Sequence, residues 1–199
     1  MNKGQKNLMV ALTLGITLFI VVSWSINSLP QRIIFEPPDF YGTSEEVSLE
    51  EMVEVANKFN LSIYIPSELL RDLKITAIYL KESPFIAIVV FSADGNKDYK
   101  TSEFGIEIAP VNPQWVPTYS EFQSEAEKSP DKTAMEINSW PVMIHENAYS
   151  GVSERRDKYG DHTLLVHLWI DEIEYLISTP TLNVNEAVSI VESMTLINA

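Results

Sequence analysis

Cysteine is absent from this chain of 199 residues. Its absence excludes disulfide bonds, a thiol nucleophile and lipid attachment through an N-terminal cysteine. An exported domain with this composition must therefore be held together by packing alone. The hydrophobic fraction of 45% is enough to fill one core, and no internal repeat or low-complexity tract is visible.

Basic residues are also scarce, because 14 Lys and Arg stand against 28 Asp and Glu, giving a formal net charge of −14. A protein that binds nucleic acid needs clustered basic side chains to meet the phosphates, so nucleic acid is not expected as a partner. The same balance disfavours docking on an anionic lipid surface. This excess of negative charge is typical of a soluble domain whose molecules repel one another.

Only seven glycines and three histidines are present. The glycines form neither a phosphate-binding loop nor the Gly-x-Ser-x-Gly elbow of serine hydrolases. His145-Glu146 begins like the zinc-protease signature, but Tyr149 stands where the second histidine must be. His162 and His167 are an odd number of residues apart, which places them on opposite faces of a strand. The histidines therefore predict no shared metal site.

A calcium loop is imitated by Asp94, Asn96 and Asp98. Tyr99 replaces the glycine that such a loop requires, and Gly105 replaces its final glutamate, so a hairpin tip explains these acids better. We expect no catalytic residue, no metal and no cofactor, and a protein that is not an enzyme.

Long apolar runs are confined to the N-terminal end. The run from Leu8 to Ile26 has no charged side chain, and as a helix it would span roughly 28 Å, close to the hydrocarbon thickness of a bilayer. Lys3 and Lys6 before it predict a cytoplasmic N-terminus and an exported remainder. An uncleaved membrane anchor over residues 1–27 is favoured by the length of the run, and a cleaved signal peptide is the alternative.

A linker over residues 28–46 is predicted by its prolines, and an α+β domain over residues 47–199 follows it. Capping boxes predict helices that begin at Ser48 and at Asn183, each with a glutamate three residues later. Alternating or apolar runs joined by short turns predict an antiparallel sheet covered on one face by these two helices. The expected strands are 61–65, 74–80, 85–91, 104–108, 135–137, 142–144, 163–170 and 173–178, with a charged loop over 154–161.

The longest irregular stretch is predicted over residues 110–132. It holds Trp115, Tyr119 and Phe122 among three prolines, and it becomes acidic towards its end. A long loop with aromatic side chains is either a binding element or a lid over the core. The alternative interpretation is that Trp115 fills a sheet face, and the high average burial of Trp favours it.

The first predicted helix leads into Ile63-Tyr64-Ile65-Pro66, and near the end come Trp169, Tyr175 and a helix closing with Glu192-Ser193. Together these stretches are similar to a family of extracytoplasmic, membrane-tethered domains of unknown function, found on anti-sigma-factor-type regulators and surface lipoproteins. The resemblance implies a small antiparallel sheet packed with helices, like domains of periplasmic sigma-factor regulatory and lipoprotein-sorting proteins. It supplies no catalytic residues, and it implies that Trp169 and Tyr175 anchor the core or line a groove.

These observations predict a membrane-anchored, extracytoplasmic binding or sensory module without catalytic activity. Its partner would be a protein, a peptide or an envelope component, met through Trp115, Tyr119 and Phe122. A carrier of lipid or another hydrophobic ligand, with the concave sheet face as its pocket, is the alternative. A hydrolase is a weaker one, because paired carboxylates such as Glu172 and Glu174 are more typical of solvated acids beside a turn.

Overall fold

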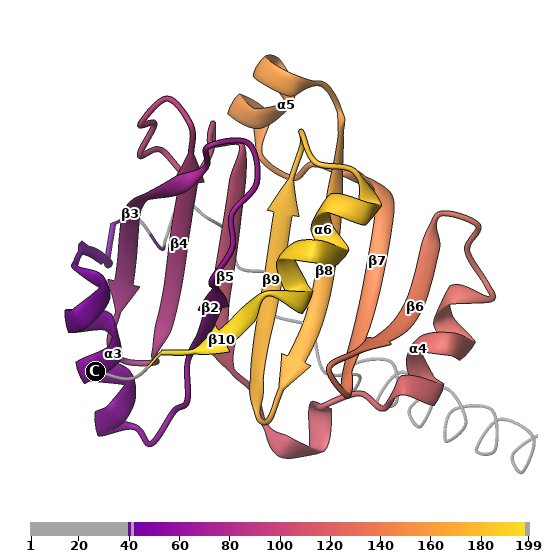
Figure 1. The fold of residues 1–199 in the computed structure, drawn as a ribbon, viewed down its shortest axis with the longest axis horizontal. Helices are drawn as coiled ribbons and strands as arrows, with labels where there is room; N and C mark the ends of the chain where they lie inside the picture. Colours follow the sequence, from indigo (N-terminus) through magenta and orange to yellow (C-terminus); the bar gives the residue numbers. More distant parts are fainter. Residues whose placement is uncertain (1–39, 41, 198–199) are drawn as a thin grey trace, which may run out of the picture. The chain divides into compact units, whose positions relative to one another are not determined.

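The computed structural model describes Phe40 and residues 42–197. These residues form an eight-stranded antiparallel sheet, a small two-stranded sheet and four α-helices (Figure 1). The large sheet contains, in spatial order, β1 (Glu45–Glu46), β3 (Lys74–Lys81), β4 (Ile86–Ser92), β5 (Phe104–Pro110), β9 (Ile173–Thr179), β8 (His162–Ile170), β7 (Trp140–Tyr149) and β6 (Lys132–Ile137). The other elements are α3 (Leu49–Lys58), β2 (Tyr64–Pro66), the 3₁₀ turn η1 (Pro113–Trp115), α4 (Tyr119–Ala126), α5 (Ser153–Tyr159), α6 (Val184–Glu192) and β10 (Met194–Leu196).

The two predicted capping boxes are confirmed. The hydroxyl of Ser48 accepts a hydrogen bond from the backbone N–H of Glu51, whose carboxylate accepts from the N–H of Ser48 at 2.7 Å. Asn183 and Glu186 make the same reciprocal pair at the start of α6. Each pair satisfies backbone donors that a helix otherwise leaves without a partner.

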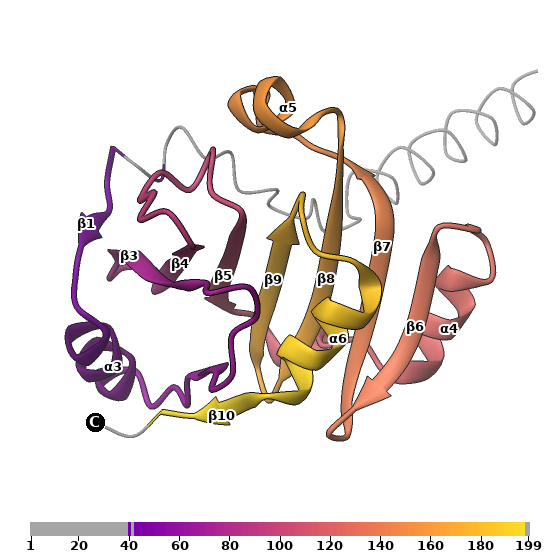
Figure 2. The ribbon, with the colours of Figure 1, turned by 45° about the horizontal axis from the view of Figure 1, so that its top comes forward.

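One face of the large sheet carries the main core. Helices α3 and α6 pack their apolar sides on it, and the side chains of Ala56 and Ile190 are completely buried there. Alternate residues of the central strands, such as Val89, Ile106 and Tyr175, meet them from the sheet. The strands β2 and β10 pair antiparallel on the same side and join this core (Figure 2).

The opposite face of the sheet is covered in part by α4 and α5. Phe122 of α4 packs on Trp169 and Met143, which alternate with the main-core residues of their strands. Arg155 of α5 reaches Ser178, which lies opposite Gly105 in the sheet. The domain therefore has helices on both faces of one sheet.

The predicted fold class is wrong in its layers and its helix count. Two helices on one face were expected, but the described residues hold four, distributed over both faces. Helix α4 lies within the predicted 110–132 loop, and α5 overlaps most of the predicted charged loop over 154–161. Both are shorter than the predicted helices and carry little apolar periodicity, so the pattern that revealed α3 and α6 is absent from them.

The predicted membrane helix finds no support in the structure. Within Phe40 and residues 42–197, no helix combines the length and the apolar character needed to cross a bilayer. The predicted anchor itself, residues 1–27 with the apolar run 8–26, lies outside the described part of the chain. At the end of the predicted linker, Glu45 and Glu46 pair with Leu80 and Tyr79 as strand β1.

Candidate functional site

Trp115 lies at the surface on a short, well-fixed turn. The side-chain oxygen of Asn112 accepts a hydrogen bond from the N–H of Gln114 at 3.0 Å, and its carbonyl accepts from Trp115 at 2.8 Å. Just before the turn, the N–H of Val111 donates to the carbonyl of Glu172 at 2.8 Å and so attaches it to the β8–β9 hairpin. Trp115 is 59% exposed, so the interpretation that it fills a sheet face is wrong.

Tyr119 and Phe122 lie in α4, whereas Trp115 lies on the preceding 3₁₀ turn. Thr118 caps this helix, and Tyr119 is partly exposed, with its hydroxyl accepting from the amide of Gln123. Phe122 is only 6% exposed, and its ring centre lies 5.3 Å from that of Trp169. The three aromatic residues therefore do not form one surface, because Trp115 points to solvent while Phe122 holds α4 on the sheet.

Acidic side chains follow Trp115 along the chain. Glu121 closes the capping box of α4, and the hydrogen bonds from Thr118 lower the pKa of its carboxyl group. Glu125 and Glu127 follow on the exposed side of the helix end, and Glu125 forms an ion pair with Lys132. The segment that follows Trp115 in the chain therefore carries exposed acidic side chains.

A second group of ionisable side chains lies on the sheet face that α4 and α5 share. Strand register places Glu107 opposite Leu176, and Leu176 opposite His167, so the three form one row across β5, β9 and β8. The Nδ1 atom of His167 lies 3.3 Å from a carboxylate oxygen of Glu174, and the imidazole stacks on Trp169. Burial raises the pKa of Glu107 to about 7, and the nearby charge of Glu174 adds to the shift.

Arg155 is a buried cation next to this row. It is 2% exposed, donates to the carbonyl of Tyr99 at 2.7 Å and to the hydroxyl of Ser178, and lies over the Tyr99 ring at 5.1 Å. Its Nε has no hydrogen-bond partner within the described residues. Because no carboxylate is among these contacts, Arg155 connects α5 to the sheet by hydrogen bonds and ring contact.

The three histidines have separate surroundings. His145 bonds through Nε2 to Asp131 at 2.9 Å, and His162 donates through Nδ1 to the carbonyl of Asn147 at 3.3 Å. Hydrogen bonds from Ser129 and His145 lower the pKa of Asp131 to about 2. Residues 40 and 42–197 contain no group of three or more His, Asp or Glu side chains arranged to hold a metal ion.

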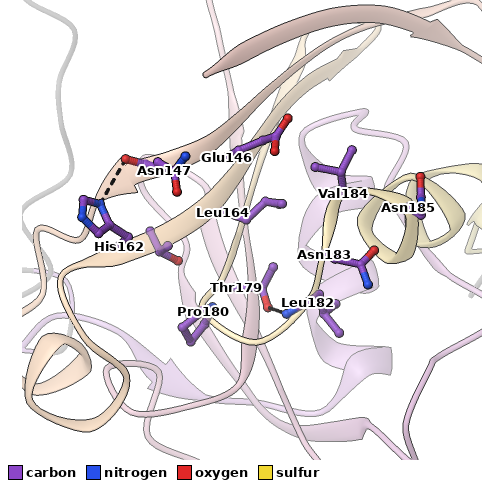
Figure 3. Close-up of a pocket in the computed structure, with 11 residues that line it drawn as sticks. Glu146, Asn147, His162, Leu164, Thr179, Pro180, Leu182, Asn183, Val184 and Asn185 are labelled. Atoms are coloured by element: carbon purple, nitrogen blue, oxygen red, sulfur yellow. Dashed lines mark hydrogen bonds between the residues drawn. The ribbon is translucent and has the colours of Figure 1, made fainter. Parts of the chain in front are cut away.

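A hollow of about 530 Å³ lies where β7 and β8 meet the start of α6 (Figure 3). Glu146, Asn147 and His162 line it from the strands, while Asn183 and Asn185 line it from the helix. None of these residues was predicted from the sequence to bind a ligand, and Glu146 was considered only as part of a failed zinc signature. The available signal was the placing of Glu146 and Asn147 together inside an otherwise regular strand run, where two adjacent polar residues interrupt the alternation.

Comparisons of the chain with family models, with curated proteins and with solved structures give no match.

Proposed function

We propose that this domain is a non-catalytic module that binds a protein or peptide partner through the turn that carries Trp115. The observation that carries the proposal is the 59% exposure of Trp115 on a turn fixed at both ends. Large aromatic side chains dominate the binding energy of protein interfaces, and Trp is highly enriched among such positions. An exposed Trp held in place loses little conformational entropy when it is covered by a partner.

The charges that follow Trp115 in the chain define the kind of partner. Glu121 is exposed on α4 and Glu127 is exposed at its C-cap, and the chain as a whole carries a formal net charge of −14. A complementary surface has an apolar cleft for the indole ring and Lys or Arg at its margin. Such charges accelerate association and are screened by salt, so binding is expected to slow as ionic strength rises.

Neither alternative function gains support from the described residues. A carrier of hydrophobic ligands needs an apolar cavity on the sheet face, but Ala187, Ile190 and Val191 of α6 are fully buried against that face. A hydrolase needs a coherent acid or histidine cluster, but His145 and His167 bond to different carboxylates.

We also propose that the domain lies outside the cytoplasm, and this location rests on the sequence of residues 1–27. Labelling intact cells with a membrane-impermeant reagent tests it. We expect the domain to be labelled without lysis. Labelling that requires lysis would place the domain inside and contradict the location.

The binding proposal is tested with a photocrosslinking amino acid placed at Trp115 of the full-length chain in living cells. We expect a discrete crosslinked product from this position. Tyr149 is the matched control, because it is 65% exposed on a different part of the domain and has no proposed role in binding. Equal products from both positions, or none from Trp115, would contradict the proposal.

A further inference from the structure

The hollow between β7, β8 and α6 is built by an irregularity in the strand pairing. His145 pairs with Leu165, but the next pair on the ladder is Ala148 with Thr163, so β7 carries one extra residue. Such a bulge turns side chains out of the regular alternation, and here it releases Glu146 and Asn147. Both are exposed, and they face α6 across the hollow (Figure 3).

The bulge is held in place by its backbone. The N–H of Glu146 donates to the carbonyl of Asp131 at 2.9 Å, and the carbonyl of Asn147 accepts from His162. No described residue bonds to the carboxylate of Glu146 or the side-chain amide of Asn147. These side chains are therefore positioned by the main chain and remain available to a ligand.

The opposite wall is the connection from β9 into α6. Thr179 fixes this connection, because its hydroxyl donates to the carbonyl of Glu103 at 2.9 Å and accepts from the N–H of Leu182 at 3.2 Å. At the helix start, the side-chain oxygen of Asn183 accepts a hydrogen bond from the N–H of Glu186. Its amide nitrogen, and the side-chain amide of Asn185, bond to no described residue.

One buried hydroxyl also belongs to this hollow. Thr163 is 4% exposed and lines the wall, and its Oγ1 has no hydrogen-bond partner among the residues that the structure describes. A buried hydroxyl without a partner costs free energy, so a ligand hydroxyl that reached it would restore the missing bond.

The charges of the hollow select against anions. Glu146 is the acidic group in its lining, and the lining contains no Lys or Arg. The nearby Glu186 is occupied, because Arg71 donates to both of its carboxylate oxygens, at 2.8 and 2.7 Å. Carboxamides, a carboxylate and an imidazole can donate to and accept from hydroxyl groups, while Leu164 and Val184 supply an apolar wall.

We propose that this hollow binds a neutral sugar, with Glu146, Asn147, Asn183 and Asn185 bonding to its hydroxyl groups. The site is separate from the Trp115 turn, and it gives the module a second, small-molecule ligand. The inference does not depend on the proposed protein partner.

Saturation-transfer NMR on the full-length chain, in a buffer free of sugar-based detergent, tests the site. The probes are glucose and N-acetylglucosamine, and glucuronate is the anionic match of glucose. We expect saturation of both neutral sugars and much weaker saturation of glucuronate. Asn147→Ala and Asn185→Ala should each weaken glucose binding by about 10-fold, the loss expected when one hydrogen bond is removed.

Asn57→Ala is the matched control, because Asn57 is an exposed asparagine on α3 whose side chain does not line the hollow. It should bind glucose like the unchanged chain. Glu146→Gln keeps the shape of the site and should reduce the discrimination against glucuronate, which provides a second readout if an alanine variant fails to fold. The proposal would be overturned if neither neutral sugar were saturated or if glucuronate were preferred. It would also be overturned if N147A and N185A bound glucose as well as the unchanged chain does.

Discussion

The hydroxyl of Tyr175, on the central strand β9, accepts a hydrogen bond from the backbone N–H of Tyr64 at 3.0 Å across 111 residues of sequence. Tyr175 is completely buried, and burial raises the pKa of its phenol group. Tyr64 belongs to β2, so this bond joins the small sheet to the large one. Both residues fall within the stretches that carry the family resemblance, which stays a prediction.

Removing the Tyr175 hydroxyl should destabilise the domain through Tyr64. Tyr175→Phe keeps the ring and leaves the part-buried N–H of Tyr64 without its acceptor, at a cost of about 1 kcal/mol in the free energy of unfolding. Urea denaturation followed by circular dichroism measures the change. Tyr149→Phe is the control, because that tyrosine is exposed. An unchanged unfolding midpoint in Y175F would show that the bond is dispensable.

Stability should depend on pH through Glu107. The pKa of this carboxyl is raised to about 7 in the folded chain from an ordinary value of 4.5, so the folded state holds its proton more tightly than the unfolded state. Its contribution to stability is therefore complete below about pH 4.5 and is lost as the pH rises through about 7. Glu107→Gln cannot lose a proton, and it should be more stable than the unchanged chain at pH 8 by up to about 3 kcal/mol.

Denaturant melts of both chains at pH 5 and pH 8 check this expectation. The gap between them should open only at the higher pH. A constant gap at both values would assign the difference to shape or packing and would contradict a titrating Glu107.

Two different substitutions of Arg155 should destabilise the domain to different extents. Arg155→Ala removes the donors to Tyr99 and Ser178 and leaves a void, which should cost about 2–4 kcal/mol. Arg155→Met removes the same donors but fills much of the same volume, so it should be less destabilising than Arg155→Ala by the part of the loss that comes from the void. Thermal unfolding of both variants measures this, and an equal loss in R155A and R155M would contradict it.

The sequence was informative at several positions that carry a clear local signal. Ser48 and Asn183 marked the starts of α3 and α6, and the turn at Asp171-Glu172 marked the β8–β9 hairpin, as observed. Thr118 with Glu121 is an equally good capping box, but the prolines around it obscured the start of α4. The prediction of a continuous loop over residues 110–132 was therefore wrong, because it missed α4.

The candidate sites were less accessible to sequence reasoning, because they depend on long-range register. Glu107 and His167 become neighbours of Leu176 only through the pairing of three strands, two of which are distant from β5 along the chain. The hollow requires the bulge after His145 to face the start of α6. The adjacent polar residues Glu146 and Asn147 indicate the bulge, but no local pattern places it opposite α6. No local pattern brings Glu107 and His167 together or predicts the burial of Phe122.

The central claim is that Trp115 is a contact residue and Phe122 is a structural one. The most direct measurement compares Trp115→Ala and Phe122→Ala in unfolding and in crosslinking to the partner from a neighbouring position, Gln114. Trp115→Ala should change the free energy of unfolding by less than about 0.5 kcal/mol and abolish the crosslink, whereas Phe122→Ala should cost about 3 kcal/mol. A Trp115→Ala variant that is strongly destabilised, or that crosslinks like the unchanged chain, would contradict the account.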